Sequence, residues 1–169
     1  MLIPIERLHR QYYGYGLADA LATKTDVTEK IRYTVHFVEQ TTGLIGVGPY
    51  LAMLLAVDAF FLNEDRHTNN IAVIRNEETK RFHMAPIYDN GLSLLSDIHD
   101  YPLSGDVYDC VDKVQAKPFG VGFDVQLEAV ERMYGVRLQF AFDESDVYRL
   151  IDDLKGIYDE AILTRVTKI

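Results

Sequence analysis

Apolar positions along this chain recur mainly with the period of an α-helix. The clearest stretch begins at Asp26, which forms a capping-box pattern with Glu29. Apolar residues from Ile31 to Val38 then keep helical spacing until Gly43, a residue typical of helix ends. We therefore predict a helix that begins after Asp26 and ends at Gly43.

The N-terminal stretch is less regular. Residues Ile3–Ala22 contain a cluster of tyrosines that is broken by Gly14 and Gly16. Glycine interrupts helices because it adopts backbone conformations that other residues avoid. We predict a short helix followed by an irregular turn.

The segment Pro49–Leu62 is apolar on nearly every face. A helix that is hydrophobic all round is normally buried, and a proline is tolerated in its first turn. Asp58 lies inside this segment. Buried carboxylates are normally paired, so we expect a central buried helix in which Asp58 bonds a nearby backbone or side-chain group.

Two strand-like runs follow a polar loop. Ile71–Arg75 and Arg81–Asp89 carry β-branched and aromatic residues, and Asn76–Lys80 between them is polar. This pattern predicts a β-hairpin in the middle of the chain.

The rest of the chain is expected to be a loop-rich segment and two helices. Ser93–Phe123 is rich in glycine and proline, and Phe123–Tyr134 has helical character until Gly135. Asp143 with Asp146 predicts the start of a last helix. Its apolar residues form one stripe, which we interpret as core packing: Val147, Leu150, Ile151, Leu154, Ile157, Tyr158 and Ile162. The whole pattern predicts one domain, residues 1–169, mainly α with a small central β-hairpin (α+β).

Composition and charge narrow the classes of function. The chain has 169 residues and a net charge of −9, which argues against nucleic acid as the main partner. Its one cysteine, Cys110, cannot form an intramolecular disulfide, so we expect a cytoplasmic protein with a buried or loop thiol. The longest apolar run, Leu51–Leu62, is interrupted by Asp58 and is too short to span a membrane.

The densest group of polar residues flanks the predicted hairpin. Asp65, His67 and Asn70 lie in the loop before its first strand, and Asp89 ends its second strand. A hairpin brings its two ends together, so Asp65, Asn70 and Asp89 should converge. Carboxylate and amide oxygens are the ligands that Mg²⁺ prefers.

This set matches the needs of phosphoryl transfer, in which a protein mainly positions groups and neutralises charge. Asp65 would orient the attacking hydroxyl or accept its proton, Asn70 would hold Mg²⁺, and Asp89 would link the metal to the phosphates of ATP. For His67 two interpretations stay open: a residue that structures the loop, or a contact to the transition state. Polar loops after helices are also common for purely structural reasons.

The residues Asp58–Leu94 (DAFFLNEDRHTNNIAVIRNEETKRFHMAPIYDNGLSL) resemble the catalytic core of HipA-type serine/threonine kinases over about 37 residues. Their D-R-H-x-x-N pattern is also similar to the catalytic loop of phosphatidylinositol 3- and 4-kinases. The resemblance implies that Asp65 is catalytic, that Asn70 and Asp89 bind the metal, and that ATP and Mg²⁺ are cofactors. Lys117–Phe119 resembles the region after the metal aspartate less specifically.

A kinase of this fold also needs an N-terminal lobe with a loop over the phosphates and a strand lysine. Only 64 residues precede Asp65, and they contain no G-x-G-x-x-G motif. We therefore expect the C-terminal lobe of a kinase that phosphorylates a protein Ser or Thr hydroxyl. It would work with a separate small-lobe polypeptide or a missing N-terminal segment. The alternative is a non-catalytic helical module that binds another protein through apolar faces.

Overall fold

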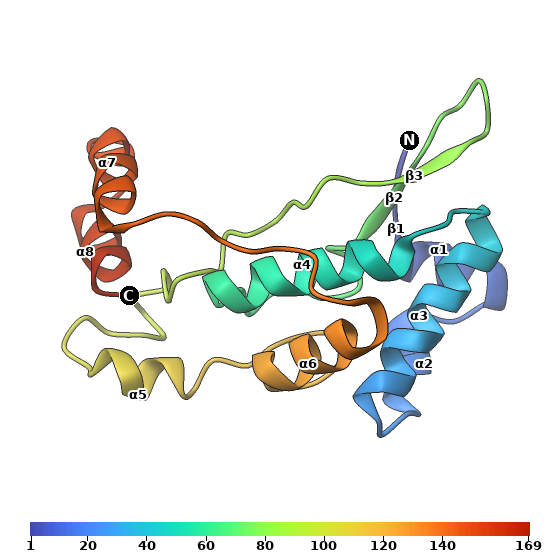
Figure 1. Cartoon of the computed structure of the whole chain (residues 1–169), viewed down its shortest axis with the longest axis horizontal. Helices are drawn as coiled ribbons and strands as arrows, with labels where there is room; N and C mark the ends of the chain where they lie inside the picture. Colours follow the sequence, from blue (N-terminus) through green and yellow to red (C-terminus); the bar gives the residue numbers. More distant parts are fainter.

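A computed structural model describes all 169 residues of the chain, which fold into eight helices and three short strands (Figure 1). In chain order the elements are β1 (Leu2–Pro4), α1 (Ile5–Tyr13), α2 (Leu17–Ala22), α3 (Val27–Thr42), α4 (Val47–Phe61), β2 (Ala72–Arg75), β3 (Phe82–Met84), α5 (Val107–Val111), α6 (Phe123–Tyr134), α7 (Glu144–Leu154) and α8 (Glu160–Lys168). The predicted α+β class is confirmed, because the chain is mainly helical and its strands form one small sheet.

The sheet has three antiparallel strands in the order β1-β2-β3. The predicted hairpin is present, with Val73 opposite Met84 and Arg75 opposite Phe82. The N-terminal strand β1 adds a third strand, with Ile3 opposite Val73. Sequence analysis missed β1 because three residues are too few to show a period of two.

Strand β3 is shorter than predicted. It ends at Met84, and the chain then runs on as irregular backbone to Asp89. Pro86 lies just beyond and has no N–H to continue the hydrogen-bonded ladder. Asp89 therefore lies five residues after the strand rather than at its end.

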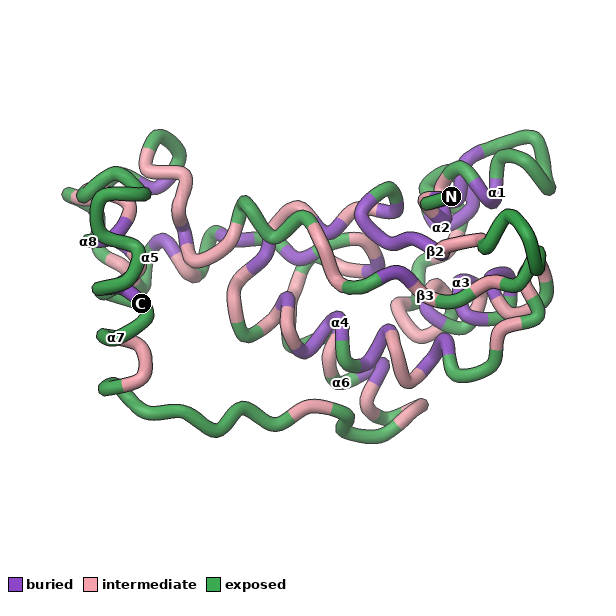
Figure 2. Tube along the Cα trace, turned by 90° about the horizontal axis from the view of Figure 1, so that it is seen from above, coloured by how far each residue is buried: buried purple, intermediate pink, exposed green.

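Helix α4 lies at the centre of the molecule, as predicted, with α3 and α6 packed against it (Figure 1). Leu51, Leu54 and Leu55 of α4 are almost completely buried in the main core, which also takes in residues of α1–α3, the sheet and α6. Figure 2 shows that buried positions concentrate along α4 and its neighbours. Helices α3 and α6 confirm the predicted bounds, with Asp26 accepting the Glu29 N–H at 2.8 Å and Gly43 ending α3 in the left-handed conformation.

The N-terminal stretch contains more helix than predicted. α1 ends at Gly14, whose φ of 84° is left-handed, and a second helix α2 follows where we expected an irregular turn. Asp19 of α2 accepts the Gly16 N–H at 3.3 Å and so helps to begin the new helix. The two glycines therefore separate two helices rather than ending helical structure.

The predicted single last helix is wrong in two respects. The chain forms two helices, α7 and α8, because the backbone turns at Gly156, whose φ is 83°. The apolar stripe is also not core packing. Ile151 is buried, but Leu150 and Ile157 are 65% and 73% exposed. In Figure 1 this helix pair lies at one end of the molecule, beyond an extended segment that follows α6.

Arg165 links helix α8 to the segment of Tyr101. This side chain is fully buried and donates from Nη2 to the carbonyl oxygen of Tyr101 at 2.8 Å. Tyr101 and Cys110, whose thiol is buried, belong to a small second core cluster with Leu95 and Val114. None of the helices combines the length and the apolar character that a membrane-crossing segment needs.

Candidate functional site

The candidate site is built on the loop that links α4 to β2. Helix α4 ends at Leu62, which adopts a left-handed conformation with φ of 52° and turns the chain out of the helix. The loop then closes on itself: the His67 N–H donates to the Asp65 carbonyl at 2.9 Å, and the Asn70 N–H donates to the His67 carbonyl at 2.8 Å. These tight turns hold Asp65, His67 and Asn70 in one compact segment.

The loop is anchored to α4 by a buried ion pair. The Nε of Arg66 donates to Asp58 Oδ2 at 2.9 Å, and its Nη2 donates to Asp58 Oδ1 at 3.0 Å. The Arg66 and Asp58 side chains are 0% and 1% exposed. This geometry confirms the prediction that Asp58 is a buried and paired carboxylate.

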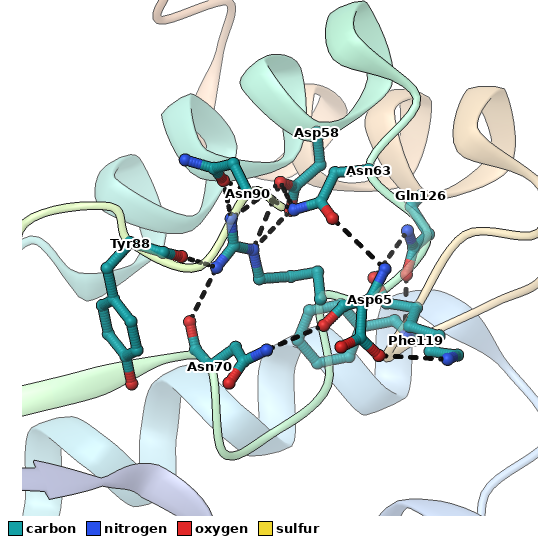
Figure 3. Close-up of polar contacts among 10 residues, drawn as sticks. Asp58, Asn63, Asp65, Asn70, Tyr88, Asn90, Phe119 and Gln126 are labelled. Atoms are coloured by element: carbon teal, nitrogen blue, oxygen red, sulfur yellow. Dashed lines mark hydrogen bonds and ion pairs between the residues drawn. The ribbon is translucent and has the colours of Figure 1, made fainter. Parts of the chain in front are cut away.

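Arg66 also binds the segment that carries Asp89. Its Nη1 donates to the carbonyl oxygens of Asn70 at 2.8 Å and Tyr88 at 2.6 Å, and its Nη2 donates to the side-chain oxygen of Asn90. Figure 3 shows Asp58, Asn70, Tyr88 and Asn90 converging on this one guanidinium. A single side chain therefore joins α4, the loop of Asn70 and the backbone on both sides of Asp89.

Burial and pairing act in opposite directions on Asp58. Burial raises the pKa of Asp58, and the hydrogen bonds and charge of Arg66, with a hydrogen bond from Asn63, oppose that rise. Asn63 donates from Nδ2 to Asp58 Oδ1 at 2.8 Å. Burial also raises the pKa of Tyr50 to about 12, against the lowering effect of the Arg66 charge. A carboxylate in this position depends on its donors, because an unpaired buried charge is costly.

The side chains of Asn63 and Asn70 hold the backbone of Asp65 from two sides. Asn63 Oδ1 accepts the Asp65 N–H at 3.2 Å, and Asn70 Nδ2 donates to the Asp65 carbonyl at 3.0 Å. Figure 3 shows Asn63 and Asn70 on either side of Asp65. Because the amide N–H₂ of Asn70 is used here, its Oδ1 is the atom left for a ligand.

The carboxylate of Asp65 faces a lysine from a distant part of the chain. Lys117 Nζ lies 3.5 Å from Asp65 Oδ1. The segment of Lys117 is held by Gln126 of α6, whose Oε1 accepts the N–H groups of Phe119 at 2.7 Å and Gly120 at 3.1 Å. Gln126 Nε2 also donates to the Lys117 carbonyl at 3.2 Å. Gln126 is almost fully buried, so α6 fixes the place from which Lys117 reaches Asp65.

Asp89 stands apart from this network. It is exposed, has a left-handed φ of 59°, and its carboxylate makes no hydrogen bond or ion pair in the structure. Aspartate is among the residues that enter this conformation most readily. The residues on either side of Asp89 are therefore held close to the loop of Asn70, whereas the Asp89 carboxylate itself is free.

The ring of His67 does not structure the loop through hydrogen bonds. Its Nδ1 is shielded from solvent and has no partner, and its Nε2 lies 3.9 Å from Asp65 Oδ2. The side chain is 44% exposed and lines a pocket beside Lys117. The ring therefore makes no hydrogen bond that would support the loop-structuring interpretation of His67.

Asn70 and Asp89 are the residues available to hold a divalent cation. Nowhere in the chain does a group of three or more His, Cys, Asp or Glu side chains gather in a way that could hold a metal ion. Mg²⁺ commonly takes only one or two protein ligands and completes its shell with water and substrate phosphates. The free Asp89 carboxylate and the uncommitted Asn70 Oδ1 are oxygen atoms of the kind that Mg²⁺ binds.

Sequence analysis missed the residues that organise the site. Arg66 lies next to Asp65 in the sequence. The sequence feature that could have identified Arg66 was Asp58, a carboxylate in an otherwise apolar helix that needs a positively charged partner. Asn63 and Asn90 carried no signal apart from their polarity. Gln126 and Lys117 lie 61 and 52 residues after Asp65, so no local pattern connects them to the loop. Comparisons with protein-family models, with curated proteins and with solved structures found no match to this chain.

Proposed function

We propose that this chain is the catalytic lobe of a HipA-like kinase that transfers a phosphoryl group from ATP to a Ser or Thr hydroxyl of a protein. The observation that carries the proposal is the position of Arg66. Its guanidinium bonds the Asn70 carbonyl, the Tyr88 carbonyl and the Asn90 side chain. The two segments that would carry the metal ligands are thus held together by one buried group.

Each side chain has a role that its surroundings support. Asp65 orients the acceptor hydroxyl and takes up its proton, and Lys117 at 3.5 Å offsets part of the charge on the Asp65 carboxylate. Asn70 and Asp89 hold Mg²⁺. When bound, the metal neutralises charge on the phosphates of ATP. Arg66 is a positioning residue, since its donors are all engaged by protein groups.

The complete reaction requires groups that cover the phosphates from the other side. Before Asp65 the chain forms β1 and α1–α4, and none of these supplies a strand lysine or a glycine-rich loop. We propose that a separate small-lobe polypeptide, or an additional N-terminal segment, provides them. The part of the site on this chain is the metal and acceptor side.

A second candidate function is a non-catalytic module that binds another protein. The observation that favours it is the apolar surface of α7 and of the turn that leads to α8, where Leu150, Ile157 and Tyr158 are more than half exposed. Such surfaces commonly mark protein interaction sites. This candidate predicts no response to nucleotide or metal, so one titration separates the two.

The test is a calorimetric titration of the chain with ATP, with and without Mg²⁺. We expect binding that requires Mg²⁺ and that is lost in Asp89→Asn, because the amide removes the charge that would hold the metal. The matched control is Asp153→Asn, which removes the same charge at an exposed site on α7. Equal binding by the wild type and Asp89→Asn would contradict the assigned metal site. Absence of any Mg²⁺-dependent binding would favour the interaction module.

A further inference from the structure

A small pocket adjoins the catalytic loop on the side of α2 and α3. Its volume is about 290 Å³, and its polar side chains are Lys30, His67, Thr68 and Lys117. The remaining wall consists of Pro118 and three apolar residues of α2. A pocket of this size lies below the range typical of drug-sized ligands, so it suits a single small group rather than a whole nucleotide.

The charge of the pocket is opposite to that of the chain. Two lysines line it and no carboxylate does, although the chain as a whole has a net charge of −9. Lys30 is half-buried, and its side chain makes no hydrogen bond or ion pair in the structure. The only side-chain partner of Lys117 is Asp65 at 3.5 Å. Lys30 in particular is a partly buried cation without a counter-charge, which favours an anion from outside.

Glu6 contacts two residues of the pocket wall, and its carboxylate is already engaged. Its Oε2 accepts the Ala18 N–H at 2.9 Å and the Thr68 hydroxyl at 2.7 Å. Burial raises the pKa of Glu6, but these hydrogen bonds and the nearby Arg10 outweigh burial and hold the pKa below its ordinary value. Glu6 is therefore charged at neutral pH, and its charge is balanced by Arg10 and these donors rather than by Lys30.

The pocket also touches the proposed catalytic carboxylate. Lys117 lines the pocket and pairs with Asp65 Oδ1, while His67 lines it with Nε2 at 3.9 Å from Asp65 Oδ2. The shielded Nδ1 of His67 has no partner within the protein. A group bound in this pocket would therefore be separated from the Asp65 carboxylate only by the side chains of Lys117 and His67.

We propose that the pocket formed by Lys30, His67 and Lys117 binds an anionic group of the phosphoryl acceptor, a carboxylate or a phosphate, next to the hydroxyl that Asp65 addresses. The acceptor is then an acidic protein segment, with Asp, Glu or a phosphorylated residue beside the accepting Ser or Thr. This assignment of the acceptor rests on the proposed kinase function. The anion site itself rests only on the pocket.

The first test uses inorganic phosphate as the probe and the backbone amide signals of Ala18 and Thr68 in NMR spectra as the readout. We expect saturable shifts at these amides. In Lys30→Gln the dissociation constant should rise about tenfold, the effect of removing one charge-assisted hydrogen bond. The matched control is Lys80→Gln, which removes the same charge at the tip of the hairpin and should leave the constant unchanged. Absence of saturable shifts, or equal effects of the two variants, would overturn the proposal.

The second test distinguishes the two sources of the anion. Three otherwise identical peptides carry Glu, phosphoserine or Gln beside one Ser, and each competes with inorganic phosphate for the pocket. We expect both anionic peptides to displace phosphate, and the tighter of the two identifies the source. Equal displacement by the Gln peptide would overturn the proposal.

These readouts need neither Mg²⁺ nor ATP, so the two proposals fail separately. Phosphate binding that depends on Lys30, together with absence of Mg²⁺-ATP binding, would remove the Mg²⁺-ATP site assigned to this chain and leave the anion site. Mg²⁺-ATP binding that depends on Asp89, without phosphate binding at Ala18 and Thr68, would leave the kinase and remove the anion site.

Discussion

Arg66 and Asp58 form an ion pair inside the protein. Both side chains are buried, and Arg66 makes further hydrogen bonds to the Asn70 and Tyr88 carbonyls and to Asn90. Removing one member of such a pair leaves a buried charge without compensation, which costs far more than the pair contributes as a whole. The stability of the loop that carries Asp65 therefore depends on Asp58, seven residues earlier on α4.

We predict that Asp58→Asn lowers the free energy of unfolding by about 3–5 kcal/mol, because the charge of Arg66 then has no counter-ion. The double variant Asp58→Leu with Arg66→Met should cost clearly less than the sum of its two single variants. Urea unfolding of the four proteins measures this coupling. Asp153→Asn, exposed on α7, is the control and should stay within about 0.5 kcal/mol of the wild type. Strictly additive effects of the two single variants would contradict the role of the pair.

Among the elements, α4 and α6 pack closely against each other at the centre of the fold. Gly48 lies in the first turn of α4, close to Tyr134 at the end of α6, and a Cβ on Gly48 would lie 2.3 Å from Tyr134 Cε1. Only glycine leaves room for the tyrosine ring at this position. The same helix α6 carries Gln126, which holds the segment of Lys117. Packing of α6 on α4 thus also positions the partner of Asp65.

We predict that Gly48→Ala lowers the free energy of unfolding by about 1–3 kcal/mol, the usual cost of overpacking, reduced in part by the better helix propensity of alanine. Thermal or urea unfolding measures the change. The control is Gly91→Ala, since a Cβ at Gly91 meets no atom within 4 Å. A loss in Gly48→Ala no larger than in Gly91→Ala would show that Tyr134 moves aside without cost.

At the scale of the whole molecule, the chain has one large core and one weakly attached end. Nineteen buried residues form the main cluster around α4, whereas the second cluster has four. Of the residues in α7 and α8, only Ile151, Leu163 and Arg165 are buried. Figure 2 shows α7 mainly as exposed chain. Regions with few buried contacts open locally at lower free energy than the core does.

We predict that backbone amides of α7 and α8 exchange with solvent at least about 100-fold faster, relative to the unfolded chain, than those of α4. Native-state hydrogen exchange measures this difference. Arg165→Met should lower protection in α8 further, because it removes the hydrogen bond to the Tyr101 carbonyl, and should leave α4 unchanged. Equal protection of α4 and α8 would show that the chain opens as one unit.

The parts of the fold that could be predicted are those whose cause is local. Asp26 and Gly43 mark the ends of α3, and Gly135 ends α6, because capping and left-handed glycine act within one helical turn. The apolar character of α4 made its burial predictable. The interpretation of the apolar stripe of α7 and α8 as core packing was wrong because burial of that stripe depends on distant parts of the chain. Helical spacing predicts an apolar face but not whether the rest of the protein covers it.

The same division holds for the candidate site. The sequence by itself determined the loop with Asp65, His67 and Asn70, the segment with Asp89 and the need of Asp58 for a partner, since each follows from residue type and order. Only the tertiary structure decided that Arg66 is that partner, that Lys117 faces Asp65 and that Lys30 and His67 share a pocket. Arg66 lies only eight residues after Asp58, but the other contacts join segments that are far apart along the chain. They depend on how the helices pack, and no local pattern records that packing.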